Sequence, residues 1–292
     1  MARPRNSAPA IARRALFVVA SFAWSLRAAP ATGPQTPLAQ IGKPDAAEAA
    51  RILEQFRQSG IAGQYFLELE LHQLPRRGDE RVFRGQLWGG RNAQGAVERV
   101  VLLDAEGREH RALVQHGPQA VVSRWTGTAA EPMSVAALFE PLVPGVEITP
   151  FDLQLPFLDW PGTTVDRIVR MRGRPAHEFL FRPPPEFAAK NARLGSVRAY
   201  FDTQFNAPVQ IELLGREGEV LKTTSLLDLK KVGGQWMVKS IDVRDDTTRN
   251  KTRLLFTGAA LNLALPAATF LPAALGNVIS PPPADRIVPL AP

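Results

Sequence analysis

The chain has 292 residues, a formal net charge of +7 and no cysteine. Without cysteine it cannot form a disulfide, a thiolate metal site, a cysteine nucleophile or a lipidated N-terminal cysteine. Residues 1–31 hold five arginines and no acidic residue, which leaves 30 basic and 28 acidic residues, a net charge of +2, in the remainder. Basic and acidic residues are interleaved there, which excludes the clustered basic face of a nucleic-acid-binding protein.

The first 31 residues have the pattern of a secretory signal peptide. Arg13 and Arg14 precede an apolar run over residues 15–26, and small residues follow up to Ala31. A bilayer-spanning helix needs about 20 apolar residues, so the run is too short for an anchor and is typical of a leader. We expect cleavage after Ala31, export to the periplasm, and a mature chain that folds as one domain.

Residues 45–60 predict one amphipathic helix. Asp45 and Glu48 have the spacing of a capping box, and Gly60 supplies a C-terminal stop. An apolar stripe at helical spacing lies between them and must face something apolar. Its members are Ala49, Ile52, Leu53 and Phe56.

Nearly everything after this helix predicts strands. In residues 65–71, for example, Tyr65, Leu67 and Leu69 alternate with Phe66 and more polar neighbours, a period of two. We predict about eleven strands joined mostly by tight Gly, Asn or Asp turns, which indicates a meander of antiparallel hairpins. Connections this short exclude the crossover helices that a parallel sheet requires.

Two segments depart from the strand pattern. Residues 133–161 are hydrophobic and irregular, and their prolines prevent one long helix. We expect this insertion to lie across the apolar face of the sheet or over a barrel mouth. The proline-rich residues 280–292 are expected to be a disordered tail that does not pair in the sheet.

The sequence offers no pattern for catalysis, a metal or a cofactor. The four histidines have no H-E-x-x-H spacing, and no G-x-S-x-G elbow occurs. Asp242, Asp245 and Asp246 lie close in sequence, but such clusters are usually solvated turn residues. A paired-carboxylate glycosidase stays open, because its defining carboxylate separation is spatial. We expect a protein that is not an enzyme.

Several motifs occur together in one order. They are FRGQLWGG (83–90), ITPFDLQLPFLDWP (148–161), GRPAHEFLFRPP (173–184), LLDLKKVGGQWMVKSIDVRDDTTRNKTRLLF (226–256) and FLPAAL (270–275). In this order the chain resembles the outer-membrane lipoprotein-sorting family, the LolA/LolB-like superfamily of periplasmic lipoprotein carriers. The resemblance covers residues 46–275.

The resemblance implies a mainly β fold: an incomplete, half-open antiparallel barrel with an N-terminal helix and a hydrophobic helical lid. The barrel domain would span residues 45–279, after a flexible segment at residues 32–44. An apolar cavity would hold acyl chains, and Arg84 is the candidate for the arginine that locks the lid in the carrier. The expected lipid-binding residues are Tyr65, Leu67, Leu69 and Trp88 in the cavity and Phe151, Leu155, Phe157 and Trp160 in the lid, and the opposite strand face is an equal alternative for the cavity.

The function implied by this resemblance is a non-enzymatic periplasmic carrier or chaperone for lipoproteins or other lipids in outer-membrane sorting. Its partners would be acyl chains and an inner- or outer-membrane protein, with no nucleic acid and no cofactor. One alternative is a lipid- or peptide-sensing regulatory module of the same fold that reports to a membrane partner. Another is a structural accessory of the cell envelope.

Overall fold

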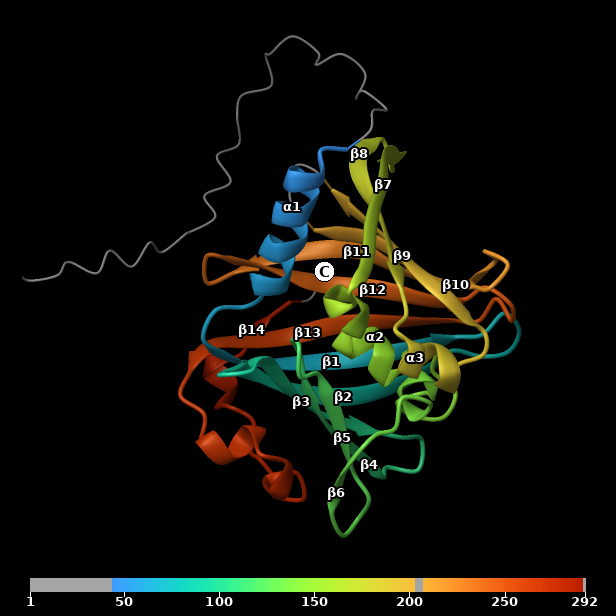
Figure 1. Cartoon of the computed structure of the whole chain (residues 1–292). Coiled ribbons are helices and arrows are strands. Elements are labelled where there is room, and N and C mark those ends of the chain that lie inside the picture. The colour runs from blue at the N-terminus through green and yellow to red at the C-terminus, as the bar shows by residue number, and fades with distance from the viewer. Residues whose placement is uncertain (1–43, 203–206, 291–292) are drawn as a thin grey trace, which may run out of the picture. The chain divides into compact units, whose positions relative to one another are not determined.

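A computed structural model describes residues 44–202 and 207–290 (Figure 1). The expected leader and residues 32–43 lie outside the described residues. The described chain forms one fourteen-stranded sheet in which every registered pair is antiparallel. The strands are β1 (Gln64–Leu74), β2 (Arg81–Asn92), β3 (Gly95–Leu103), β4 (Glu109–Gln115), β5 (Val121–Trp125), β6 (Ala130–Pro132), β7 (Gly162–Met171), β8 (Arg174–Arg182), β9 (Leu194–Asp202), β10 (Pro208–Gly215), β11 (Val220–Val232), β12 (Gln235–Asp245), β13 (Lys251–Leu263) and β14 (Val288–Pro289).

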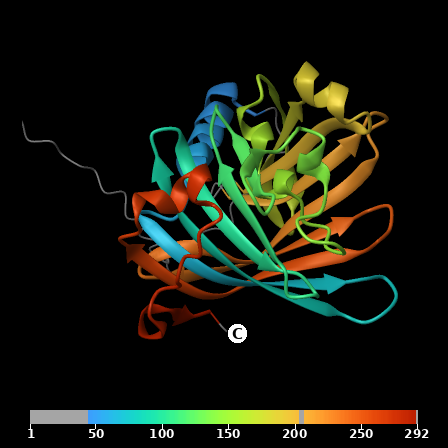
Figure 2. The same ribbon diagram turned by 90° about the horizontal axis from the view of Figure 1, so that it is seen from below.

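The sheet is open, and one segment of the chain joins its two edges. The strand order runs β6-β5-β4-β3-β2-β1-β13-β12-β11-β10-β9-β8-β7, with β14 added beside β13. The first and last long strands, β1 and β13, therefore pair in the middle, and β6 and β7 are the edges. Residues 133–161 connect these edges and lie within the concave side of the curved sheet (Figure 2). We call this connection the bridging segment.

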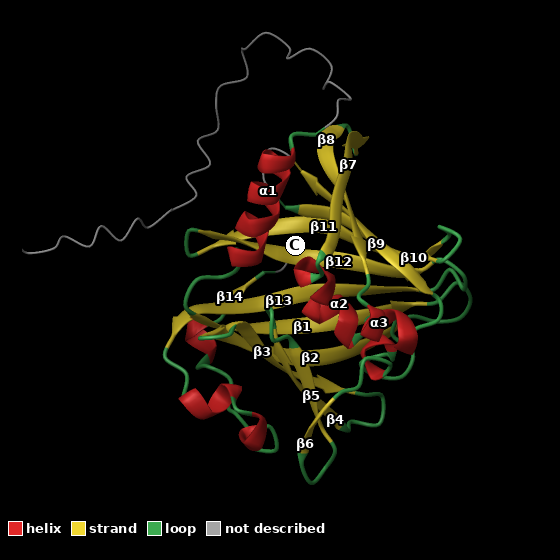
Figure 3. Cartoon of the chain, in the orientation of Figure 1, coloured by secondary structure: helices red, strands yellow, loops and turns green. Residues whose placement is uncertain are grey.

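This arrangement confirms the predicted half-open barrel. The sheet has more strands than the eleven predicted, partly because β6 and β14 have three and two residues and are too short to show a period-two pattern. The bridging segment contains only short helical pieces, as its prolines require. They are η1 (Ala137–Phe139), α2 (Pro150–Gln154) and η2 (Pro156–Asp159); the other helices are α1 (Ala46–Gln58), α3 (Pro185–Lys190), η3 (Ala267–Phe270), η4 (Pro272–Ala274) and η5 (Ala284–Arg286) (Figure 3).

Helix α1 forms as the sequence predicts and packs by its apolar stripe. The Asp45 side chain caps its first turn by accepting a hydrogen bond of 2.8 Å from the Ala47 amide. Ala49, Ile52 and Leu53 are buried. The ring of Phe56 lies 5.1 Å from that of Phe201 on β9, so the stripe packs on that half of the sheet.

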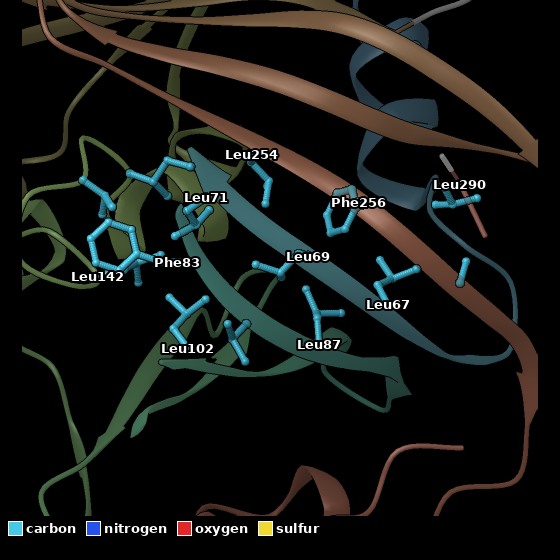
Figure 4. Close-up of a cluster of buried hydrophobic side chains, with 14 of the residues drawn as sticks. Leu67, Leu69, Leu71, Phe83, Leu87, Leu102, Leu142, Leu254, Phe256 and Leu290 are labelled. Carbon is cyan, nitrogen blue, oxygen red and sulfur yellow. The ribbon is translucent and has the colours of Figure 1, made fainter. Parts of the chain in front are cut away.

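The concave side holds two hydrophobic clusters. The inner cluster joins the middle of the sheet to the first part of the bridging segment (Figure 4). The lid cluster joins α1, α2 and η2 to strands β8–β10. Buried members of the inner cluster include Leu67, Leu69, Leu71, Phe83, Leu87, Val143, Ile148, Met237, Phe256 and Leu290.

The opposite, convex face is covered by the C-terminal segment. Phe66 and Trp88 are buried there against Phe270 and Ile287. Arg99 is only 1% exposed, and its guanidinium donates hydrogen bonds of 2.9 and 3.0 Å to the carbonyl oxygens of Ala274 and Leu275. A buried cation thus holds the C-terminal segment by its backbone.

The expectation of a disordered tail that cannot pair in the sheet is wrong for residues 280–290. Strand β14 lies in register with β13, pairing Val288 with Ala259 and Pro289 with Gly258. Strand β12 pairs with β13 only as far as Leu255 among the described residues, which leaves part of the β13 edge free. The Leu290 amide donates to the Thr257 carbonyl at 2.8 Å, so proline's missing N–H is not needed there.

We predict that Arg99→Ala lowers the free energy of unfolding by about 3 kcal/mol, because it leaves buried carbonyl groups without their charged donor. Urea denaturation followed by circular dichroism measures this change. Arg84→Ala is the matched control: the Arg84 side chain is 79% exposed and lies 3.4 Å from Glu70. Its expected effect is below about 1 kcal/mol, and equal losses in the two variants would contradict the assigned role of Arg99.

Candidate binding site

The structure brings three of the four predicted cavity residues to one face of the sheet. Tyr65, Leu67 and Leu69 are 7%, 3% and 4% exposed and belong to the inner cluster. Trp88 lies on the convex face, because it pairs with Phe66, whereas Leu67 pairs with Leu87. Its assignment to the concave face is therefore wrong, since cross-strand partners share a face.

Two glycines of β2 let β1 side chains lie over that strand. Gly85 and Gly89 stand opposite Leu69 and Tyr65. A Cβ on Gly89 would overlap the Tyr65 ring, and one on Gly85 would meet Leu102 and the carbonyl of Val101. These glycines of the FRGQLWGG motif thus make room for the larger side chains.

A polar network lies beside the inner cluster and reaches the bridging segment. The Tyr65 hydroxyl donates a 2.8 Å hydrogen bond to Glu98 on β3. His116, just after β4, has Nε2 3.5 Å from the Glu98 carboxylate. Its Nδ1 lies 3.2 Å from the carbonyl oxygen of Gln154, to which it donates. The network therefore links β1, β3 and the end of α2.

The network changes the pKa of each of its titratable members. Burial and the Glu98 carboxylate raise the pKa of Tyr65. Burial opposes ionisation of Glu98 and of His116, but their mutual attraction outweighs it, so the pKa of Glu98 is lowered and that of His116 is raised. The pair is therefore held in its charged form beside the bridging segment.

The predicted lid residues gather in the lid cluster. Phe151, Phe157 and Trp160 are buried, and Leu155 packs partly buried against them. The Phe151 ring lies 6.1 Å from both Phe157 and Trp160, and Phe157 lies 5.0 Å from Phe181 on β8. These aromatic contacts connect α2 and η2 to the sheet. The role of the cavity and lid residues in binding a lipid stays a prediction.

Polar contacts hold both ends of the lid, which consists of α2 and η2. The Lys222 ammonium on β11 donates to the Asp152 carboxylate at 2.8 Å and to the Glu147 carbonyl at 2.9 Å. Asp152 also accepts from the Thr149 amide and hydroxyl, which completes a capping box at the start of α2. At the other end, Arg57 of α1 donates to the Leu158 carbonyl at 2.8 Å.

Side chains of the inner and lid clusters pack between the bridging segment and the sheet. A cavity of about 20 Å³ lies there, with Val100, Leu102, Met133 and Leu142 in its lining. It is large enough for about one water molecule. An acyl chain therefore fits at this position only when the lid moves or side chains rearrange.

Charged side chains beside one surface cleft pair with one another. An open cleft of about 500 Å³ is lined by Arg108, His110 and Arg111. Both Arg108 and His110 contact the Asp104 carboxylate, at 2.8 and 2.9 Å. Within residues 44–202 and 207–290, no group of three His, Asp or Glu side chains is placed to hold a metal. The Asp242 carboxylate, which sequence reasoning placed in a solvated turn, instead pairs with Lys251 and Arg253, at 2.9 and 2.7 Å.

Known structures share this architecture. A domain assigned to the outer-membrane lipoprotein-sorting proteins of Vibrio parahaemolyticus matches with a TM-score of 0.65 and 13% identity, over 79% of this chain and 97% of that one. A DUF1329 family protein from Desulfovibrio piger gives 0.65 and 13%, over 80% and 100%. A LolA superfamily protein from Nitrosomonas europaea gives 0.59 and 14%, over 76% and 97%.

This chain shares the fold of these structures. The resemblance found in the sequence is thereby confirmed for the fold. A family model described as an uncharacterized protein matches residues 183–277. No curated protein matches the chain in sequence. Among the described residues, no helix has the length and apolar character needed to cross a bilayer.

In this structure, Arg84 does not lock the lid. It pairs with Glu70 at 3.4 Å and is 79% exposed, on the same face of β1 and β2 as Trp88. Lys222 instead pairs with the Asp152 carboxylate of the lid, at 2.8 Å. Sequence reasoning missed it because one lysine in a strand carries no signal of its distant partner, Asp152.

We predict that Lys222→Met loosens the lid and lowers the free energy of unfolding by about 3 kcal/mol, because it leaves a buried carboxylate without its cation. Hydrogen exchange should rise in α2 and η2, and urea denaturation gives the global change. Lys239→Met is the matched control, since Lys239 lies 3.6 Å from Asp228, whose side chain is 54% exposed. Exchange in α2 that is unchanged by Lys222→Met would contradict the anchoring role.

The raised pKa of His116 predicts a pH dependence. A folded-state pKa above the ordinary value of 6.5 gives stabilisation that is complete below pH 6.5 and is lost as the pH rises through the raised pKa. The free energy of unfolding of the wild type should therefore fall relative to His116→Gln above pH 6.5. Urea titrations at several pH values test this, and parallel curves would contradict it.

Proposed function

We propose that this protein is a non-enzymatic periplasmic carrier or chaperone that binds acyl chains of lipoproteins or other lipids for outer-membrane sorting. One observation supports this most directly. The apolar concave face of an open sheet is covered by short helical pieces instead of a second sheet. Such covers can separate from the sheet without breaking its strand pairing.

The chemistry of the interior suits an acyl chain. The inner and lid clusters consist of aliphatic and aromatic side chains that come from both halves of the sheet. Transfer of a chain from water into such surroundings gains about 0.8 kcal/mol per CH₂ group. Affinity would come from chain length, and the polar ties of the lid would set how often the interior opens.

The cellular place is part of the proposal. The expected leader would send the chain to the periplasm, and the fold is shared with a domain assigned to lipoprotein sorting.

The first test is native mass spectrometry of the protein purified from the periplasm, followed by organic extraction. We predict a stoichiometric lipid or acylated peptide. Incubation with palmitic acid should give a one-to-one complex in protein from which lipid has been removed. A protein that stays empty after incubation with palmitic acid, phospholipid and lipoprotein would contradict the carrier function and favour the sensing module.

Variants of the inner cluster test where the chain binds. Leu69→Gln places a polar group in the inner cluster and should weaken palmitate binding at least about tenfold, given the unfavourable burial of an amide. Leu69→Met retains the apolar volume and should bind like wild type. Trp88→Phe, on the convex face, should also leave affinity unchanged. Circular dichroism checks that each variant is folded, and equal effects of Leu69→Gln and Trp88→Phe would contradict the site.

A further inference from the structure

The sheet divides beside the inner cluster. Strands β12 and β13 pair over residues 240–244 and 251–255. Before Ser240, β12 continues along β11 as far as the Gly233–Gly234 turn, and after Leu255, β13 continues along β1. In the described chain, residues 235–239 form no strand pairs with residues 256–263. We call this divergence the fork.

The end of the described chain lies in the fork, beside β13. Ile287 packs on the convex face, with Phe66 and Trp88 nearby. Three residues later, Leu290 is 0% exposed within the inner cluster on the concave side. Figure 4 shows Leu290 at the same end of that cluster as Phe256 and Leu67. The segment that begins as β14 thus lies beside β13 and directs the Leu290 side chain into the interior.

The Leu290 side chain is held in the inner cluster by fewer interactions than hold the lid. The lid has the Lys222 and Arg57 contacts together with its aromatic cluster. The end of the tail has a two-residue bridge to β13, the hydrogen bond of the Leu290 amide and one buried side chain. Residues 281–283, which precede it, are prolines without N–H donors. The tail can therefore leave with the loss of few interactions.

The fork opens onto the part of the inner cluster that surrounds Leu290. An acyl chain in the fork would meet the same apolar side chains. Leu67, Met237 and Phe256 belong to the same cluster, and its members continue to Val143 and Ile148 under the bridging segment. When the tail leaves, the backbone groups of β13 lie at an open edge, where water can satisfy them. The aliphatic contacts of the Leu290 side chain are then lost, and an acyl chain can replace them.

We propose that the acyl chain of the ligand enters through this fork and takes the place of the Leu290 side chain in the inner cluster. The proposal rests on the proposed carrier function and names the route and the first subsite for the chain. Residues 288–290 occupy the fork in the ligand-free protein and are displaced when the acyl chain binds. The lid cluster then moves apart as the chain extends under the bridging segment.

The absence of cysteine from the sequence makes this directly measurable. Leu290→Cys in the full chain carries one thiol at the buried position. Val288→Cys is the matched control, because Val288 belongs to the same bridge but is 50% exposed. Labelling by a maleimide is timed with and without palmitic acid, while native mass spectrometry reports how much palmitate is bound.

Without palmitate, the Leu290→Cys thiol should react at least about tenfold more slowly than the Val288→Cys thiol, because it reacts only after local opening. Saturating palmitate should raise the Leu290→Cys rate about tenfold or more and leave the Val288→Cys rate within about twofold. That result supports the fork as the route.

Palmitate that binds without changing the Leu290→Cys rate would overturn the fork proposal and leave the carrier function standing. Equal labelling of the two thiols in the absence of palmitate would also overturn it, because the tail would not be seated. A protein that binds no palmitate would overturn both proposals together.

Discussion

The rest of the structure depends on one constraint: a curved sheet with an apolar concave face does not close on itself. Its edges, β6 and β7, are joined by the chain but not by hydrogen bonds. Because apolar surface must leave water, the bridging segment and α1 cover the interior. The proline-rich composition of the bridging segment divides it into short turns, so the cover consists of separate pieces.

Polar contacts decide how firmly each piece is held. Lys222 and Arg57 bind backbone carbonyls of the lid, and Lys222 adds a buried carboxylate. Arg99 likewise donates to backbone carbonyl oxygens of the C-terminal segment on the convex face. In each case a cation satisfies carbonyl oxygens that irregular backbone leaves unpaired. The fold therefore combines a strongly paired sheet with covers that local opening can release.

The C-terminal segment covers the convex face of the sheet, whereas the bridging segment and α1 cover the concave face. The C-terminal segment lies mainly over Phe66 and Trp88, and among its described residues Leu290 belongs to the inner cluster. The fork between β12 and β13 makes this contact possible, because β14 pairs with the edge of β13 that β12 leaves free. A terminal strand of two residues thus connects the outer covering to the inner cluster.

The sequence by itself determined the local features. The Asp45 cap and the apolar stripe after it gave α1, and alternation in residues such as Leu67 and Leu69 gave the strands, because both patterns follow from backbone periodicity. The order of the motifs indicated the fold. Only the tertiary structure decided which residues share a face: the register that pairs Trp88 with Phe66 moved Trp88 to the convex side. The Lys222–Asp152 pair and the place of Leu290 join residues distant in sequence. Local pattern could not determine them, because such contacts depend on how the sheet curves and where strands diverge.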